Sequence, residues 1–170
     1  MKIINISDIR LQGKDIWQDF NQSIFEVTDK SDGSIFSSKY DLLMMAWNGF
    51  SVNDSKNIVL EKAIQGAIDI QREIDRFSSD KQISFDYRLG LCSDFGVIGD
   101  IAYKQCNHYQ IISDASEKAE ILSTLSFLQS KNVYCDESFF TALKNKYKLK
   151  EIDTDVFYSG LQGRYYKMIL

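Results

Sequence analysis

The sequence predicts an α+β fold in which about four helices cover a mostly antiparallel sheet. Two patterns lead to this fold class. Several long segments place an apolar residue at every third or fourth position, which is the spacing of an amphipathic helix. Between them lie short runs rich in β-branched and aromatic residues, bounded by turn clusters, as is typical of strands. No internal repeat or linker interrupts the pattern, so one domain over residues 1–170 is expected.

The first half of the chain is predicted to contain a strand, two helices and a hairpin. A strand rich in isoleucine leads from the N-terminus to Asp8, and apolar residues at helical spacing follow over residues 14–27. Residues 35–47 carry strong apolar residues on both sides of the polar segment 37–41, which predicts a hairpin with that segment at its tip. The clearest amphipathic helix covers residues 55–77.

The second half is predicted to alternate strands with two helices. We expect strands at residues 83–92, 97–102, 109–112 and 133–135, a polar loop at 104–108, and helices at 115–128 and 138–147. A closing hairpin is then expected to pair residues 156–158 with residues 165–169 across the segment SGLQG.

The bulk composition suits a compact globular fold. The 170 residues are 44% hydrophobic, which is enough for a full core without disulfides or structural metals. The net charge is -4, the pI is about 5.0, and the sequence has no basic block. We therefore expect neither non-specific binding to nucleic acid nor a polybasic membrane anchor. No apolar run reaches bilayer-spanning length, and the first 20 residues lack a signal-peptide pattern.

The few cysteines and the one histidine limit the kinds of catalytic and metal site that we expect. Cys92, Cys106 and Cys135 are widely spaced and form no CxxC pair, so three reduced thiols in a cytoplasmic protein are expected. With His108 as its one histidine, the sequence argues against a histidine-rich metal site and against a serine-type triad.

The most informative polar residue near the N-terminus is Asp8. It follows an apolar strand, and a short segment that ends in a glycine separates it from the next element. A carboxylate at a strand end, with free backbone N–H groups beyond it, can hold a divalent ion together with a polyphosphate. The predicted phosphate-binding segment consists of Ile9, Arg10, Leu11, Gln12 and Gly13. From this segment alone, the alternative is that Asp8 only caps the following element.

Four segments, in this order and at roughly these distances, resemble motifs of the class III adenylate/guanylate cyclase catalytic domain. Residues 6–13 (ISDIRLQG) resemble the family's strand-acid-Ile-x-Gly-Phe loop, and residues 39–47 (KYDLLMMAW) its Lys-x-x-Gly-Asp-Gly-x-Leu-Ala-x-Phe hairpin. Residues 87–101 (YRLGLCSDFGVIGDI) resemble its Arg-Ile-Gly-x-His-x-Gly and Gly-Asp-Ile-Gly segment. Residues 109–122 (YQIISDASEKAEIL) resemble its Tyr-x-x-Ile-Gly-Asp-x-Val-Asn-x-Ala-x-Arg-Leu segment. The resemblance spans essentially the whole chain and implies a class III cyclase-like fold with a ferredoxin-like or palm-type core.

The resemblance also implies a metal site, a substrate and a partner. In that family two domains pack head to tail around the active sites, so a homodimer that binds a nucleoside triphosphate is implied. Asp8 and Asp41 stand at the positions of the two metal-binding aspartates, which would hold two Mg²⁺ or Mn²⁺ ions. Family members use these ions to activate the ribose 3′-hydroxyl, which attacks the α-phosphorus and expels pyrophosphate. The alternative is that both acids are surface residues near turns.

Ser37 and Gln110 stand at the two positions that read the base in this family. Adenylate cyclases carry Lys with Asp or Thr there, and guanylate cyclases carry Glu with Cys. A serine hydroxyl and a glutamine amide each donate and accept hydrogen bonds, so the pair suits uracil or cytosine as well as a purine edge. The alternative is that two polar residues merely line a pocket.

The positions that act on the transition state depart from the family. Glu117 stands where the family has the Asn that orients the ribose, and Ile121 where it has the Arg that neutralises the α-phosphate. Leu161 replaces a Lys of the final hairpin in some members, and Tyr40 replaces the glycine before the second aspartate. Loss of one such electrostatic group typically lowers the rate by about 10²–10³-fold. The cations that would substitute in a different geometry are Arg10, Lys39, Arg88 and Lys118.

Three functions remain open from the sequence. The favoured one is a divergent nucleotidyl cyclase that makes a 3′,5′-cyclic mononucleotide and pyrophosphate, with a pyrimidine among the candidate bases. The second is a catalytically degenerate cyclase-homology domain that binds a nucleotide or a protein. The third is a palm-domain nucleotidyltransferase that uses the same two acids to join nucleotides.

Overall fold

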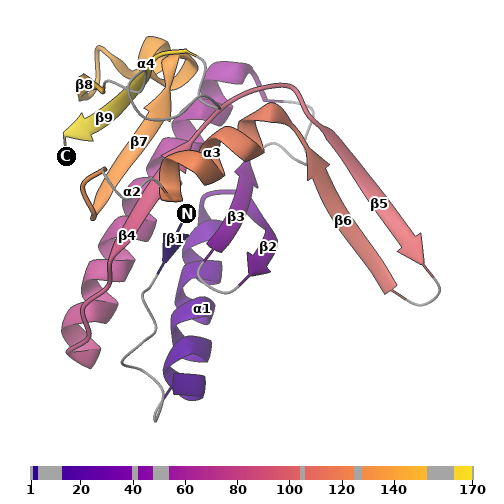
Figure 1. The fold of residues 1–170 in the computed structure, drawn as a ribbon, viewed down its shortest axis with the longest axis vertical. Helices are drawn as coiled ribbons and strands as arrows, with labels where there is room; N and C mark the ends of the chain where they lie inside the picture. Colours follow the sequence, from indigo (N-terminus) through magenta and orange to yellow (C-terminus); the bar gives the residue numbers. More distant parts are fainter. Residues whose placement is uncertain are drawn as a thin grey trace.

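The computed structural model describes residues 2–3, 13–39, 42–47, 54–103, 106–124, 128–152 and 163–169. In these residues it confirms the predicted α+β fold, with four helices and two sheets (Figure 1). The helices are α1 (Gly13–Lys30), α2 (Lys56–Lys81), α3 (Asp114–Thr124) and α4 (Glu137–Leu143). The strands are β1 (Lys2–Ile3), β2 (Gly33–Lys39), β3 (Leu42–Trp47), β4 (Tyr87–Leu91), β5 (Val97–Tyr103), β6 (Cys106–Ile112), β7 (Asn132–Asp136), β8 (Lys148–Ile152) and β9 (Tyr165–Ile169).

Seven of the strands form the main sheet, in the order β2-β3-β1-β4-β7-β9-β8. Neighbouring strands are antiparallel except for β4 and β7, which run parallel. β5 and β6 form a separate two-stranded sheet, here called the arm, which projects from the body of the molecule (Figure 1). The chain passes through the arm and α3 between β4 and β7, because parallel neighbours need a long crossover.

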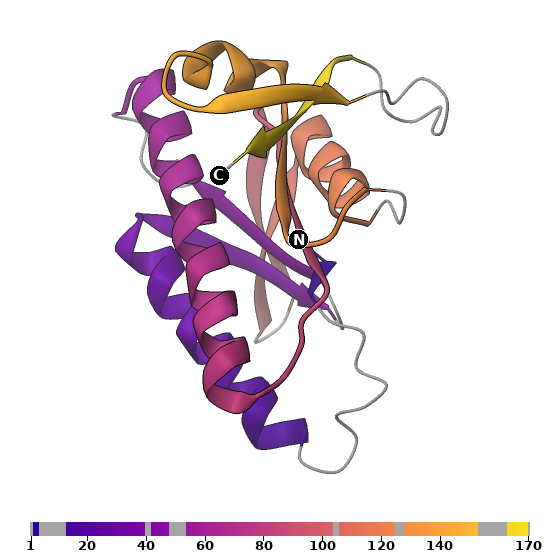
Figure 2. The same ribbon diagram turned by 90° about the vertical axis from the view of Figure 1, so that its left-hand side faces the viewer.

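The helices lie on both faces of the main sheet. α1, α2 and α4 cover one face and α3 covers the other (Figure 2). The larger core cluster lies under α1, α2 and α4, and a smaller one lies between α3, β7 and β9. Leu122, Leu128, Tyr134 and Tyr165 are the buried residues of the smaller cluster. The face of β2 and β3 that α1 and α2 do not cover is therefore the face near α3 and the arm.

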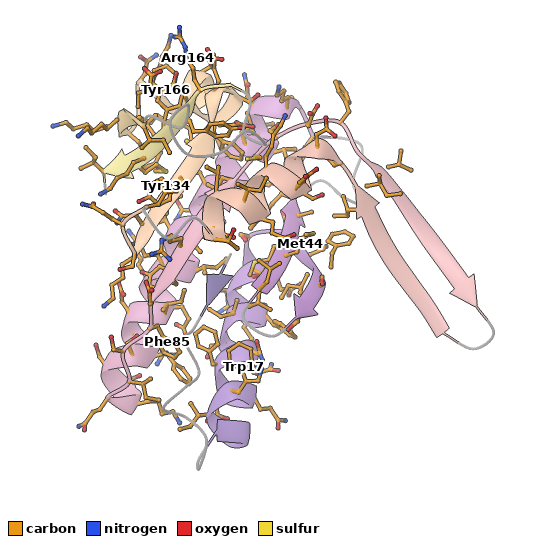
Figure 3. The ribbon with its side chains drawn as sticks, viewed as in Figure 1. Trp17, Met44, Phe85, Tyr134, Arg164 and Tyr166 are labelled. Carbon is orange, nitrogen blue, oxygen red and sulfur yellow. The ribbon has the colours of Figure 1, made fainter. Side chains whose placement is uncertain are left out.

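A cluster of aromatic rings packs α1 and α2 against the end of the sheet where β4 begins. The Phe20 ring is fully buried, and its centroid lies 5.4 Å from that of Phe77 and 4.9 Å from that of Phe85. Trp17 stacks on Phe20 from the next turn of α1, with ring centroids 5.6 Å apart (Figure 3). The i, i+3 spacing of Trp17 and Phe20 places both rings on one helix face, as the predicted helix requires.

Trp47 lies at the end of the hairpin where β2 begins and β3 ends. Its indole N–H donates to the carbonyl oxygen of Ser31 at 3.0 Å. The ring fits against Gly33 and Gly66, because a Cβ on Gly66 would lie only 2.5 Å from Cζ2 of Trp47. The hairpin is thus fixed at its base to both α1 and α2.

α2 confirms the clearest helix of the sequence and extends it to Lys81. Its buried residues recur at the predicted spacing, and Gln82 ends it in the left-handed conformation with φ 55°. The backbone N–H of Gln82 donates to the carbonyl oxygens of Ser78 and Ser79 in the last turn, as is typical of a C-terminal cap. None of the helices in the described part of the chain is both long and apolar enough to cross a bilayer.

The structure corrects the predicted end of the chain. α4 ends at Leu143, and β8 follows it and pairs with β9. The predicted pairing partner of β9, residues 156–158, lies outside the described residues. The β8 segment KLKEI is mostly charged, and Leu149 packs on the larger core cluster. Charged residues of this kind are equally common at the end of a helix, so the sequence does not identify this segment as a strand.

The arm and α3 also differ from prediction. β6 begins at Cys106, so the end of the predicted polar loop 104–108 belongs to a strand, which pairs with β5. Polar residues are tolerated in a projecting ribbon because it need not bury both faces. α3 ends at Thr124, yet Leu128 is still buried in the smaller core cluster.

Glu73 on α2 allows a prediction about pH. Both of its carboxylate oxygens accept from the Arg76 guanidinium, at 2.6 and 2.9 Å, and this pairing lowers the pKa of Glu73. Since the folded state prefers the ionised carboxyl, the pair contributes stability above pH 4.5, the group's ordinary pKa, and loses it as the pH falls through the lowered value. We expect Glu73→Gln to lower the urea midpoint slightly at pH 7 and by less at pH 3.

The control is Glu120→Gln, which neutralises an exposed glutamate on α3. Urea unfolding of both variants at the two pH values measures the effect. Equal destabilisation by Glu73→Gln at pH 7 and pH 3 would contradict an electrostatic origin.

Candidate functional site

A bulge in β2 determines the direction of Ser37. Ile35 pairs with Met45 and Ser37 with Met44, so Phe36 is an extra residue between the two pairs. Residues that pair across antiparallel strands share a face, so the bulge places Ser37 on the face opposite to Ile35 and Met45. Met45 packs against the larger core cluster, and Met44 lies on the opposite face, away from α1 and α2 (Figure 3). The strand register places Ser37 on that face with Met44. Ser37 is half-buried there.

The strand register bears on the predicted metal ligands, although Asp8 and Asp41 themselves lie outside the described residues. Leu42, which follows Asp41 directly, pairs with Lys2 of β1. Because β1 and β3 are antiparallel, the last described residue of β1, Ile3, and the first residue of β3, Leu42, lie at the same end of these two strands.

The predicted phosphate-binding segment is described only at its last residue. Gly13 is the first residue of α1, and residues 9–12 lie outside the described part. The first N–H groups of a helix have no intrahelical partner and favour negative charge. The segment thus leads into an element whose N-terminus suits a phosphate group.

Gln110 lies on β6, in the arm, where its cross-strand partner is Gly99. β6 lies against β2 of the main sheet, so the strands that carry Ser37 and Gln110 are neighbours. The two residues are 73 positions apart in sequence (110 minus 37). The structure therefore brings their strands together, while the side chain of Gln110 is not among those described.

α3 carries the two positions at which the sequence departs from the cyclase pattern. Glu117 is exposed, and Ile121 is half-buried against the smaller core cluster. Ile121 thus has a packing role, which explains an aliphatic side chain at this position. Arg88 is not available as a replacement cation, because it is 9% exposed and its Nε donates to the carbonyl oxygen of Leu128 at 2.6 Å. Lys118 is half-buried on α3, and the Arg10 and Lys39 side chains are outside the described set.

No group of three or more His, Cys, Asp or Glu side chains that could hold a metal ion occurs among the described residues. The predicted pair of carboxylates lies elsewhere, at positions 8 and 41. Two aspartates supply the oxygen ligands that Mg²⁺ and Mn²⁺ prefer, and such sites are completed by water and by phosphate oxygens of the substrate. The donor chemistry of the two predicted aspartates therefore fits a divalent ion.

The buried thiols take no part in this site. Burial raises the pKa of the Cys135 thiol to about 12 and raises that of Cys92 as well. Cys135 pairs with Leu91 and packs in the larger cluster, whereas Cys92 packs on the smaller one across the sheet. Because burial suppresses their thiolate form, these two cysteines are unreactive, and both are free thiols, as predicted.

Asp136 is a half-buried acid whose role the sequence does not predict. Its carboxylate accepts from the Ser93 N–H at 2.7 Å and from the Phe139 N–H at 3.1 Å. It therefore caps α4 and also ties down the chain between β4 and the arm. Burial raises its pKa, while the bonds to backbone N–H groups oppose that shift. An aspartate at the end of a strand, directly before a helical segment, is the sequence signal for such a cap.

The base of the arm carries the most exposed apolar side chains of the described residues. Phe95 is 98% exposed, Val97 67% and Ile112 70%. Val97 pairs with Ile112, so these two side chains share one face at the base of the arm. The Ser113 hydroxyl donates to the carbonyl oxygen of Phe95 at 3.1 Å, which holds the Phe95 backbone beside the end of β6. We call Phe95, Val97 and Ile112 the arm-base surface. An exposed apolar group of this kind is a candidate interaction site.

Comparison with solved structures identifies the fold. The adenylyl cyclase CyaB from P. aeruginosa superposes with a TM-score of 0.82 at 12% identity, covering 99% of this chain and 90% of that one. The guanylate cyclase domain of RhGC from Catenaria anguillulae, in complex with GTP, gives 0.77 at 16% identity, with 99% and 92% covered. A non-canonical dimeric guanylyl cyclase domain of the RhoGC fusion protein from the aquatic fungus Blastocladiella emersonii gives 0.78 at 18%, also with 99% and 92% covered.

These likenesses confirm the class III cyclase-like fold that the four motifs imply. No protein-family model matches the sequence, and no curated protein is significantly similar to it. At such low identity the likeness concerns the fold, and the chemistry has to be argued from the residues.

Proposed function

We propose that the chain is a nucleotidyl cyclase that converts a nucleoside triphosphate into a 3′,5′-cyclic mononucleotide and pyrophosphate. The observation that carries the proposal is the register of β1, β2 and β3. It pairs Lys2 with Leu42, the residue that follows Asp41, and through the bulge it turns Ser37 to the face beside the arm. The cyclase fold supports the same arrangement.

In the proposed reaction the ribose 3′-oxygen attacks the α-phosphorus of the same nucleotide. A new bond from the 3′-oxygen to phosphorus forms, and the bond from the α-phosphorus to the oxygen that bridges to the β-phosphate breaks. Pyrophosphate leaves with that electron pair, and the 3′-hydroxyl proton passes to solvent. Mg²⁺ or Mn²⁺ bound by Asp8 and Asp41 would favour ionisation of the 3′-hydroxyl and offset negative charge on the phosphates. The N-terminus of α1 would favour the phosphates in the same way.

Ser37 and Gln110 are the proposed base-reading residues. Neither side chain carries a charge, so neither excludes a base by its sign. Both can donate and accept, which suits the alternating carbonyl and N–H or amino groups on the edge of uracil or cytosine. A pyrimidine triphosphate is therefore included among the proposed substrates, together with the purines.

The proposed cyclase works as a homodimer, and the arm-base surface is its proposed contact. Exposed apolar side chains at this density are stabilised when a second chain covers them. The acidic net charge and the lack of a basic block argue against nucleic acid or a membrane as the partner. We propose a cytoplasmic location because the three widely spaced cysteines are expected to be reduced thiols.

Replacing Ile112 by lysine is expected to separate the dimer. A charge at the centre of an apolar contact is costly to bury, and the exposed position means that folding should not suffer. Light scattering should then give the mass of one chain, 19.6 kDa, in place of twice that value. The rate of product formation should fall when the dimer separates, because the proposed site lies between two chains.

The control for this substitution is Ile58→Lys, at an apolar position on α2 that is 47% exposed. It should leave both mass and turnover unchanged. A dimeric Ile112→Lys variant would show that the arm-base surface is not the contact.

A second function is favoured by α3. Ile121 is committed to packing, Glu117 adds a negative charge near the proposed phosphates, and Arg88 is bound to Leu128. These features suit a nucleotide-binding or protein-binding module that has lost the means to stabilise a transition state. Such a module would bind a triphosphate without converting it.

One experiment separates these functions. The purified chain is incubated with Mn²⁺ and each of ATP, GTP, CTP and UTP, and the products are identified by mass spectrometry. A cyclic mononucleotide and pyrophosphate support the cyclase, and a linked dinucleotide supports a nucleotidyltransferase instead. Binding without any product supports the module.

A further inference from the structure

β8 lies at the end of the main sheet opposite to β2, the strand next to which the arm is found (Figure 1). It pairs with β9 over its whole length without a register shift, and among the described strands it has no second neighbour. In an antiparallel pair, every second residue turns its backbone N–H and C=O away from the partner strand. β8 therefore offers these groups, evenly spaced, to a further extended chain.

Three lysine side chains lie on one face at this end of the sheet. Lys148 and Lys150 alternate along β8, so they share a face, and Lys150 pairs directly with Lys167 of β9. Lys148 and Lys150 are exposed, and Lys167 is half-buried. We call these three residues the lysine face. Uncharged residues and Glu151 separate the lysines in the sequence, so the pairing of β8 with β9 is what gathers them.

The charge of the lysine face is not balanced within the part of the chain that the structure describes. Lys167 donates to the neutral Oε1 of Gln129 at 2.5 Å, and no ion pair there involves any of the three lysines. Glu151, the acid of β8, belongs to the opposite face and lies 3.8 Å from the Arg164 guanidinium. The face is therefore free to attract an anionic partner.

Protection of the outermost strand accounts for only part of this charge. Lysines on such a strand discourage it from pairing with copies of itself. Lys167, however, lies on β9, which already has a neighbour on each side. Like charges directly opposite each other also destabilise two paired strands, and Lys150 faces Lys167 in this way. The lysine face thus has a cost in stability that edge protection does not explain.

We propose that β8 binds an extended acidic segment of a partner protein, which joins the main sheet as a further strand. Side chains alternate between the two faces of a strand, so acids at every second position would lie opposite Lys148 and Lys150. The residues between these acids would lie on the face of Leu149, which is half-buried on the larger core cluster, and apolar side chains fit there. The expected ligand is therefore a segment in which acids alternate with apolar residues.

The same observations disfavour three other occupants of this surface. A second copy of β8 would bring lysines against lysines. Single-stranded nucleic acid is held by stacking on aromatic rings as well as by cations, and the aromatic residues of β8 and β9, Tyr165 and Tyr166, are both buried. An anionic bilayer would attract the lysines but would leave the backbone groups of β8 unpaired. A peptide satisfies both the charges and the backbone.

The test uses the full chain and short peptides with blocked ends. Fluorescence anisotropy measures binding of a labelled seven-residue peptide in which glutamate alternates with valine, and hydrogen exchange followed by NMR reports the β8 amide protons. We expect the peptide to bind and to slow exchange at the outward amide groups of β8. A peptide with lysine in place of glutamate should not bind. The glutamate peptide methylated on its backbone nitrogens should bind at least about tenfold more weakly, because it cannot donate to β8.

Lys150→Glu is the variant that tests the charge. It replaces an attraction by a repulsion at an exposed position, and it removes the like-charge pair with Lys167, so folding should be kept. It should weaken binding of the glutamate peptide by roughly three- to 20-fold and allow the lysine peptide to bind. Arg72→Glu is the matched control, because it makes the same change in net charge on α2, at a side chain that is 74% exposed. It should change neither affinity.

The proposal does not depend on nucleotide turnover, so it stands or falls separately from the proposed function. It is overturned if the glutamate peptide does not bind, if exchange of the β8 amides is unchanged, or if the methylated peptide binds equally well. An equal effect of Lys150→Glu and Arg72→Glu also overturns it, because the attraction would then be one of net charge. Tighter binding to a single-stranded oligonucleotide or to phosphatidylserine vesicles than to the glutamate peptide would assign the lysine face to that partner instead.

Discussion

Substituting Asp41 by asparagine is expected to abolish pyrophosphate release from the preferred triphosphate. The amide keeps the size of the side chain and removes the charge that would hold a divalent ion. Losing that electrostatic support should lower the rate by roughly 10²–10³-fold or more. Asp8→Asn should do the same, and the double variant should be little worse than either single one, because the two acids would act as a unit.

The assay for both variants is pyrophosphate release with Mn²⁺ at saturating nucleotide. Asp32→Asn is the matched control, because Asp32 directly precedes β2 at the other end of the same hairpin and is exposed. It should retain activity and folding. Full activity of Asp8→Asn or Asp41→Asn would remove these residues from the proposed metal site, even if the chain proved to be a cyclase.

The second large effect is expected at Gly90 in β4, where α3 crosses the sheet. A Cβ on Gly90 would overlap the carbonyl oxygen of Ala119 and would lie 3.0 Å from the Cβ of Leu122. The first neighbour is backbone, which cannot rotate away as a side chain can, so α3 would have to move. Gly90→Ala should therefore cost about 2–4 kcal/mol of unfolding free energy.

A loss of this size corresponds to a fall in Tm of roughly 5–15 °C for a chain of this length. Gly99→Ala is the control, since its added methyl group meets nothing, and it should leave Tm almost unchanged. Urea and thermal unfolding of the pair measure the difference. Equal stability of the two variants would mean that α3 does not pack as closely on β4 as the structure has it.

The parts of the fold that the sequence predicts well are those with a strong local pattern. α2 follows from apolar periodicity, and the order of the four motifs indicates the cyclase fold that the comparisons confirm. The hairpin of β2 and β3 is also predicted, but its tip is not: Ser37, Ser38 and Lys39 belong to β2 and pair with β3 rather than lying at the tip. The missed strand segments are polar. β8 is mostly charged, and the part of β6 before the predicted strand 109–112 is polar, so both are identified only by their pairing partners.

The candidate site is predicted less completely, for a related reason. The sequence names Ser37 and Gln110 but cannot show the bulge that turns Ser37, nor that β6 lies against β2. It offers Arg88 as a spare cation, while the structure shows a buried guanidinium bound to Leu128. It treats Ile121 as a lost arginine, and packing against the smaller core cluster explains the aliphatic residue. Asp8 and Asp41 stay predictions.

The bulge at Phe36 has an effect beyond the direction of Ser37. β2 is an outermost strand of the main sheet, and a regular outermost strand offers a row of backbone N–H and C=O groups to any other extended chain. An extra residue breaks the even spacing of that row and increases the local twist, so a foreign strand cannot continue the ladder past it. The irregularity that shapes the proposed base site therefore also protects the protein from aggregation at this edge.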